Sequence, residues 1–128
     1  MTEWVARQLE LLRAQWPDLG YDQAGNWVRI PGWELPAGWT PQVVDIAFQI
    51  KEEADQPPYA FYVNATDLKH NGNVPGSWAP TTDQVSFPGT WSQFSWGPET
   101  WVPTANPELG PNMVIFVRSF AVRFAEGA

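Results

Sequence analysis

The sequence contains no cysteine, which excludes disulfide bonds, cysteine-ligated zinc and a thiol nucleophile. It contains one histidine, His70, which by itself cannot form a conventional histidine-rich metal site. Its seven basic residues are dispersed, so it lacks the basic patch that nucleic acid requires. No apolar run approaches the roughly 20 residues of a membrane span, and the N-terminus has no signal-peptide core. We therefore expect a cytoplasmic protein without a metal or cofactor, whose partners include neither nucleic acid nor membranes.

The length and composition of the chain indicate one globular domain over residues 1–128. Apolar residues make up 44% of the chain and charged residues 16%, which is typical of a folded protein. The formal net charge of -7 favours basic proteins as partners. Nine tryptophans, seven phenylalanines and three tyrosines exceed what a core of this size requires, so we expect some rings at a protein interface.

An N-terminal helix is predicted over residues 3–16. Its apolar positions recur at helical spacing, and they are Val5, Leu9, Leu12 and Trp16. Thr2 is a suitable N-cap, and Pro17 and Gly20 follow the last helical position.

Three strands with short connections are predicted next, as an antiparallel meander. The first covers residues 27–30 and ends at Pro31-Gly32, and the third covers residues 59–63. The clearest strand is 42–51, where one face is apolar and carries Val44, Ile46, Phe48 and Ile50.

Residues 64–112 are rich in glycine, proline, asparagine, serine and threonine, which predicts a long irregular region. We expect tryptophans to fix it in place, one further short strand at 84–87, and the functional site somewhere within it. The closing segment, 112–125, fits a helix, with Arg118 and Arg123 opposite its apolar stripe. The chain is therefore expected to fold as an α+β domain.

The stretch 87–98 places two hydroxyls, Ser92 and Ser95, between bulky rings, with Thr90 just before them. One interpretation is an aromatic-rich loop whose serines bond the backbone. The other is a hydroxyl nucleophile held on a rigid, partly desolvated loop. Because no base is adjacent in the sequence, the chemistry alone favours the structural interpretation. His70 precedes an Asn71-Gly72 turn signal, which is typical of a solvated loop histidine.

Taken together, the segments resemble the ubiquitin-conjugating enzymes, and specifically the divergent prokaryotic branch encoded beside ubiquitin-like proteins and activating enzymes. The similarity covers about residues 3–125. The stretches that carry it are Val28-Arg29-Ile30-Pro31, Leu35-Pro36-Ala37-Gly38-Trp39, the strand 43–50, Gln56-Pro57-Pro58 before 59–63, Trp91-Ser92-Gln93-Phe94-Ser95, Trp101-Val102-Pro103 and the segment from Met113. The resemblance implies a UBC-like fold: an N-terminal helix, an antiparallel meander sheet, a long irregular active-site region and a C-terminal helix.

Two features depart from the family pattern. Eukaryotic relatives carry a cysteine after a His-Pro-Asn motif, whereas this chain has neither, and His70-Asn71 echoes that motif only weakly. Three explanations are open: a hydroxyl replaces the thiol, the domain is a non-catalytic variant that positions its cargo, or a cysteine of the natural protein has been replaced. The prokaryotic pattern tends to place a serine at the position of Ser95, which favours the hydroxyl.

The resemblance then implies a carrier that receives the C-terminus of a ubiquitin-like protein from an activating (adenylating) enzyme, as an oxyester on Ser95. Secondary candidates for the site are Ser92, Thr90, His70 and Asn71. Arg7 and Arg13, on the polar side of the first helix, correspond to the family's contact with the activating enzyme. The alternative within the family is a non-catalytic scaffold that binds the same partners. A rival from another class is an aromatic-rich carbohydrate-binding module, against which the amphipathic first helix and the meander argue.

Overall fold

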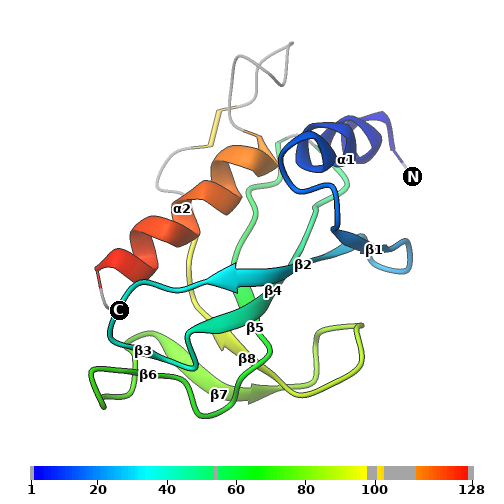
Figure 1. The fold of residues 1–128 in the computed structure, drawn as a ribbon. Coiled ribbons are helices and arrows are strands. Elements are labelled where there is room, and N and C mark those ends of the chain that lie inside the picture. The colour runs from blue at the N-terminus through cyan, green and yellow to red at the C-terminus, as the bar shows by residue number, and fades with distance from the viewer. Residues whose placement is uncertain (1, 54, 98–100, 103–111, 127–128) are drawn as a thin grey trace.

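Two helices pack against one face of an antiparallel sheet, as the computed structural model of the chain shows (Figure 1). It describes residues 2–53, 55–97, 101–102 and 112–126. The elements are α1 (Glu3–Gln15), β1 (Gly20–Asp22), β2 (Trp27–Glu34), β3 (Trp39–Thr40), β4 (Val43–Gln49), β5 (Phe61–Val63), β6 (Lys69–His70), β7 (Trp78–Thr82), β8 (Trp91–Phe94) and α2 (Met113–Ala125). The main sheet has six strands in the order β1-β2-β4-β5-β8-β7, and β3 and β6 form a separate pair. The predicted α+β class is confirmed, with a helix at each end of the sheet in sequence.

The helix α1 forms as predicted and ends one residue earlier. The Thr2 hydroxyl accepts a hydrogen bond from the Val5 amide at 3.2 Å, which satisfies one of the free N–H groups at the start of the helix. At the other end, the Trp16 amide donates to the Leu12 carbonyl at 2.7 Å. Of the predicted apolar stripe, Val5, Leu9 and Leu12 are buried and Trp16 is half-buried.

The antiparallel meander is confirmed, since β2 pairs with β4 and β4 pairs with β5. All three strands differ from the prediction in their bounds, and β4 covers 43–49 where 42–51 was predicted. β2 continues through Pro31-Gly32 to Glu34, because an irregularity between Ile30 and Trp33 absorbs the turn-forming residues. β5 begins at Phe61 and not at residue 59, because Ala60 has a φ of 70° and so leaves the extended conformation.

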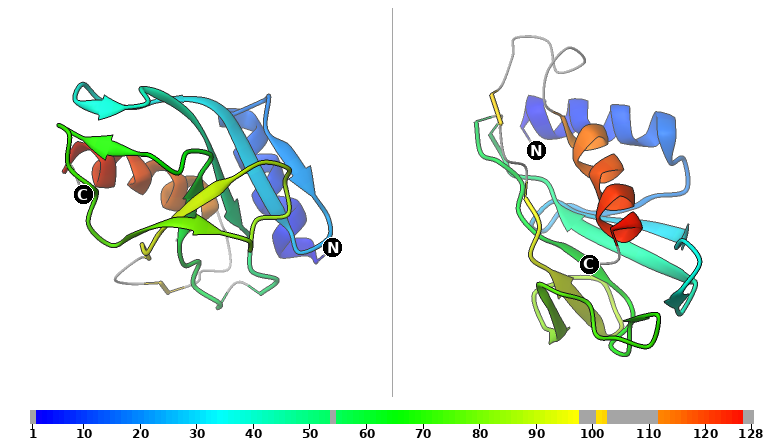
Figure 2. Two further views of the ribbon diagram at one scale, coloured as in Figure 1. Left: turned by 90° about the horizontal axis from the view of Figure 1, so that it is seen from below. Right: turned by 90° about the vertical axis from the view of Figure 1, so that its left-hand side faces the viewer.

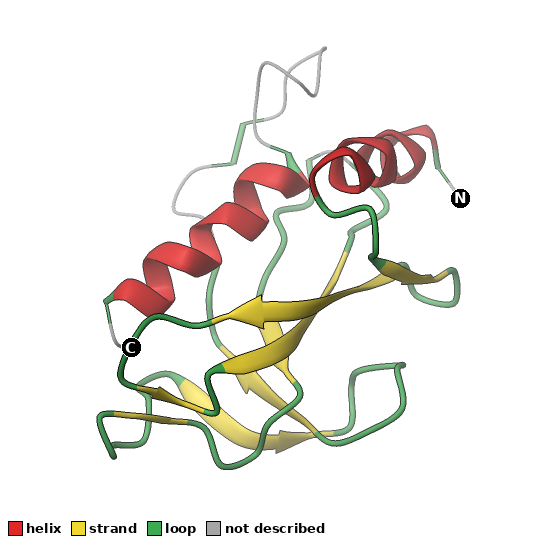
Figure 3. Cartoon of the chain, viewed as in Figure 1, coloured by secondary structure: helices red, strands yellow, loops and turns green. Residues whose placement is uncertain are grey.

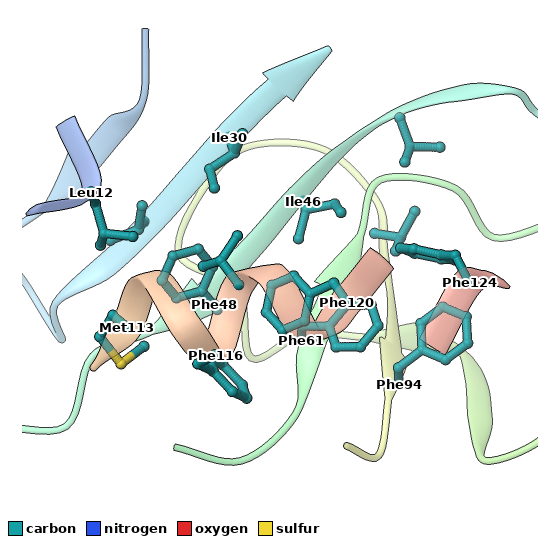
Figure 4. Packing of buried hydrophobic residues seen from close by; sticks show 14 of the residues in the cluster. Leu12, Ile30, Ile46, Phe48, Phe61, Phe94, Met113, Phe116, Phe120 and Phe124 are labelled. Carbon is teal, nitrogen blue, oxygen red and sulfur yellow. The ribbon is translucent and has the colours of Figure 1, made fainter. Parts of the chain in front are cut away.

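The helix-facing side of the sheet carries the larger core (Figure 4). All four predicted apolar residues of the second meander strand are buried there. Phenylalanine rings continue this core onto α2: Phe61 stacks on Phe120 with centroids 4.2 Å apart, and Phe94 meets Phe124 edge-on at 5.6 Å. The helical interpretation of 112–125 is confirmed, and the Asn112 side chain caps α2 by accepting from the Ile115 amide at 3.0 Å.

The opposite face of the sheet carries a smaller cluster, which consists of Trp27, Ala47, Ala60, Tyr62 and Trp91. The connection between β7 and β8, residues 83–90, lies on the side of the sheet away from the helices (Figure 2). Its side chains Val85 and Phe87 pack against the cluster. The prediction of a strand at 84–87 is therefore wrong. The Trp91 indole N–H donates to the Phe87 carbonyl at 3.2 Å, and the Tyr62 hydroxyl donates to the Gln84 side chain at 2.9 Å. Side-chain bonds thus hold this segment where a strand ladder was expected.

The expectation of a long irregular region over 64–112 is wrong for the part that the structure describes. That part contains β6, β7 and β8, and β8 joins the main sheet between β5 and β7 (Figure 3). Residues 98–100 and 103–111 lie outside the described residues. They include Pro103 of the Trp101-Val102-Pro103 stretch. Among the described helices, none has the length and apolar character needed to cross a membrane.

Candidate functional site

The end of β8 gives the two candidate serines opposite environments. Ser92 is 0% exposed, and its hydroxyl donates to the Val63 carbonyl of the neighbouring strand at 3.2 Å. Phe94 is likewise 0% exposed and belongs to the helix-side core, whereas Ser95, the next residue, is exposed. Of these two hydroxyls, only that of Ser95 is accessible to a large reaction partner.

Three hydrogen bonds hold Ser95 and the next residue, Trp96, to distant parts of the chain. The Ser95 amide donates to the Ser77 carbonyl at 2.9 Å, next to β7. The Trp96 carbonyl accepts from the Ala60 amide at 2.7 Å, just before β5. The Trp96 indole N–H donates to the Ser119 hydroxyl on α2 at 2.8 Å. Within the described part of the chain, the Ser95 hydroxyl itself has no hydrogen-bond partner, so it is an exposed group on an immobilised backbone.

A charged residue that sequence reasoning placed elsewhere lies under this segment. Arg123 was expected opposite the apolar stripe of the C-terminal helix, but it is 7% exposed, so that expectation is wrong. Its guanidinium carbon lies 5.5 Å from the ring centroid of Phe94 and 5.8 Å from that of Trp96. It also donates to the Gly76 carbonyl at 2.5 Å.

Helical spacing could have indicated the burial of Arg123, because it stands three residues after Phe120 and seven after Phe116. The prediction placed Arg123 on the polar side because the residue is charged. Burial lowers the pKa of the Arg123 guanidinium, and the nearby carboxylate of Glu126 opposes that effect. Aromatic faces and a carbonyl oxygen compensate for the lost hydration.

His70 and Asn71 lie in a hairpin beside the main sheet. His70 belongs to β6 and is half-buried, with its ring centroid 4.9 Å from that of Trp39, so the expectation of a solvated loop histidine is wrong. The Asn71-Gly72 turn is confirmed, since both residues have positive φ and the backbone of His70 pairs with Asn73. In the described residues, no hydrogen bond joins His70 or Asn71 to Ser95.

The remaining candidates lie apart from Ser95 in sequence or in the fold. Thr90 is exposed and precedes β8, at the strand end opposite to Ser95. On α1, Arg7 forms an ion pair with Glu10 at 2.7 Å, and Arg13 is exposed. Of the predicted nucleophiles, Ser92 is buried, whereas Ser95 and Thr90 are exposed at opposite ends of β8. In the described residues, no hydrogen bond joins Ser95 to any of the secondary candidates.

Comparisons of the chain with protein-family models, with curated proteins and with solved structures each found no match. In the part of the chain that the structure describes, no three His, Cys, Asp or Glu side chains are grouped so that they could hold a metal ion. The chemistry available at the end of β8 is that of an exposed hydroxyl, and the aromatic residues before and after it contact a buried guanidinium. Such a hydroxyl can accept an acyl group when a partner supplies a base.

Proposed function

We propose that this protein is a carrier in a bacterial ubiquitin-like conjugation pathway, which accepts the C-terminus of a ubiquitin-like protein as an oxyester on Ser95. The observation that carries the proposal is the contrast at the end of β8, where Ser95 is exposed on a fixed backbone and Ser92 is buried. The order of helix, antiparallel sheet and helix is compatible with a UBC-like fold. The sequence motifs that resemble the divergent prokaryotic branch of that family also support the proposal.

The proposed reaction is acyl transfer. The Ser95 Oγ attacks the C-terminal carbonyl carbon of the ubiquitin-like protein, which the activating enzyme holds as a thioester. The new C–O bond forms, the C–S bond breaks, the thiolate of the activating enzyme leaves, and the serine proton passes to a base. An acceptor amine later attacks the ester, which yields an amide and restores the serine hydroxyl.

A serine hydroxyl is much less acidic than a thiol, so this step requires a general base and donors for the oxyanion. Since the Ser95 hydroxyl has no partner in the described part of the chain, the base is assigned to the activating enzyme. The carrier would then react only inside the complex, which would protect the ester from premature formation or loss.

The proposed contact with the activating enzyme is the polar side of α1, which carries Arg7 and the exposed Arg13. The other side of this helix is part of the core, so deleting it would also remove buried packing. Arg13→Glu is the cleaner test, because it reverses one exposed charge and leaves the core intact. Binding to the activating enzyme should weaken about tenfold, as for a rim charge with 1–2 kcal/mol of coupling.

The experiment for the proposed function is reconstitution with the activating enzyme, the ubiquitin-like protein and ATP. A covalent adduct should form that survives reducing agent and is cleaved by strong hydroxylamine or alkali. Ser95→Ala should abolish it, while Thr90→Ala should leave it intact. An adduct that persists in Ser95→Ala would assign the nucleophile to another residue.

A non-catalytic scaffold is the second candidate, and one observation favours it. No base is positioned on the Ser95 hydroxyl within the described residues, as a binding domain without chemistry would also show. This candidate predicts that the ubiquitin-like protein binds while no adduct forms under any condition. The carbohydrate-binding rival is disfavoured, because all nine tryptophans are described and each is buried or half-buried.

A further inference from the structure

Arg123 contacts the chain on both sides of Ser95 without belonging to the same segment. Its guanidinium lies over Phe94, the residue before Ser95, and over Trp96, the residue after it. It also donates to the carbonyl of Gly76, whose neighbour Ser77 accepts the hydrogen bond from the Ser95 amide. One side chain from α2 therefore contacts the residue before Ser95, the residue after it and the stretch that accepts its amide hydrogen bond.

The chemistry of arginine suits this combination of contacts. A guanidinium is planar and weakly hydrated, so its faces can lie against aromatic rings while its edge donates hydrogen bonds. A lysine ammonium retains the charge, but it is a compact group that cannot reproduce the planar contact with two rings. A neutral aliphatic side chain of similar length retains only the packing.

We propose that Arg123 is a positioning residue, which fixes the backbone of Ser95 so that its hydroxyl meets the incoming carbonyl in a productive geometry. This inference rests on the proposed function in that the reaction is acyl transfer to Ser95. It goes further by assigning a specific role to a buried side chain of α2. Reacting atoms must approach to about 3–3.5 Å, and a misplacement of about 1 Å can reduce the rate about 100-fold.

The test compares Arg123→Met and Arg123→Lys with a matched control, Arg118→Met. Arg118 is an exposed arginine of the same helix, and it donates to the Gln15 side chain at 3.0 Å. Two quantities are measured for each variant: the hydrogen-exchange rate of the Ser95 amide, and kcat and KM for transfer of the ubiquitin-like protein from the charged activating enzyme. The exchange rate of the Phe48 amide in β4 reports whether the fold is intact.

In Arg123→Met, the Ser95 amide should exchange about tenfold faster while the Phe48 amide is unchanged. Its kcat should fall by about 10- to 100-fold with KM within about twofold, because binding is retained and orientation is lost. Arg123→Lys should retain part of the rate, and Arg118→Met should match the parent protein in every readout.

Three results would overturn the proposal. Unchanged exchange at Ser95 in Arg123→Met means that Arg123 does not fix this backbone. Faster exchange with an unchanged kcat means that the fixation does not serve the reaction. Faster exchange at Phe48 together with a rate that falls in proportion to the folded fraction means that Arg123 acts on stability alone. If the parent protein forms no adduct, the proposed function fails, and the Ser95 exchange rate still decides whether Arg123 fixes that segment.

Discussion

The two faces of the main sheet are covered in different ways. On one face, α1 and α2 cover a large core in which phenylalanine rings from β5, β8 and α2 contact one another. On the other face, five buried residues lie beneath the irregular segment 83–90. Regular elements cover the helix face by burying apolar surface, whereas individual side-chain hydrogen bonds help to hold the segment on the outer face.

The difference between the two faces indicates which of them holds the candidate site in place. Phe94 is fully buried on the helix face, and the Trp96 side chain is bonded to α2, so Ser95 stands between two residues held from that face. The outer face contributes one link, the hydrogen bond from the Ala60 amide to Trp96. Substitutions that remove packing on the helix face should therefore lower stability most. Substitutions on the outer face should have smaller, local effects.

The largest effect is expected from truncation on the helix face. Phe120→Ala should lower the free energy of unfolding by about 3–5 kcal/mol, because it removes a fully buried ring that contacts Phe48, Phe61 and Phe116. Denaturant titration measures the change. Val122→Ala, at an exposed position of the same helix, should stay within about 0.5 kcal/mol. A loss below about 1 kcal/mol for Phe120→Ala would contradict the importance of this face.

Truncation on the outer face should have a smaller effect. Phe87 is half-buried against the outer cluster, so Phe87→Ala should cost about 1–2 kcal/mol, part of the value for a fully buried ring. Ser86→Ala, an exposed neighbour in the same segment, is the control and should be near neutral. If Phe87→Ala cost as much as Phe120→Ala, the two faces would not differ as described.

The hydroxyl of Tyr62 provides a test of the polar bonds on the outer face. Tyr62→Phe should cost about 0.5–1.5 kcal/mol near neutral pH, because the hydrogen bond to Gln84 is lost. Burial raises the pKa of Tyr62 above the ordinary value of 10.0 in the folded state, so the neutral form favours folding. The stability that depends on this neutral form is present below pH 10.0 and is lost as the pH rises through the folded-state pKa. Denaturant titrations between pH 8 and 11 should therefore show a weaker alkaline loss in Tyr62→Phe, and an identical loss in both proteins would refute the assignment.

The smallest effect is expected at Ala60, a buried residue of the outer cluster. This residue has a φ of 70°, a conformation that glycine adopts without the cost of a side chain. Ala60→Gly should stabilise the protein by up to about 1 kcal/mol, because the relief of strain is opposed by the entropy of glycine and by the loss of one buried methyl. Thermal unfolding measures the change. Destabilisation by more than about 1 kcal/mol would show that the methyl contributes more than the strain costs.

Sequence patterns predicted the elements whose periodicity is carried by many residues. Both helices and the meander are of this kind, since each buries a regular stripe in the helix-side core. The pair β3 and β6 was missed, because two-residue strands carry no periodic signal. The segment 83–90 was misassigned because its order comes from the bonds of Gln84 and Trp91 to specific partners, which local sequence does not encode.

The candidate site was only partly predictable. The alternation in β8 places Ser92 on the helix side with Phe94 and Ser95 on the other side. It does not predict the exposure of Ser95, because Trp91 lies on that other side too and is buried in the outer cluster. The Ser95 amide bonds to residue 77, and Trp96 beside it bonds to residues 60 and 119, all of which are distant in sequence. Arg123 was missed because a charged side chain is normally solvated, and the aromatic rings and the Gly76 carbonyl that compensate for its burial are distant in sequence.

The most direct test of Ser95 as the acyl acceptor is the chemical stability of the adduct formed by Ser95→Cys. In reconstitution with the activating enzyme, the ubiquitin-like protein and ATP, the parent protein should form an oxyester that survives reducing agent. Ser95→Cys should gain the same added mass on acylation, but reducing agent should remove it, because the acyl group is then held as a thioester. Intact-mass measurement before and after reduction distinguishes the two. An adduct that resists reduction equally in both proteins would contradict acylation at Ser95.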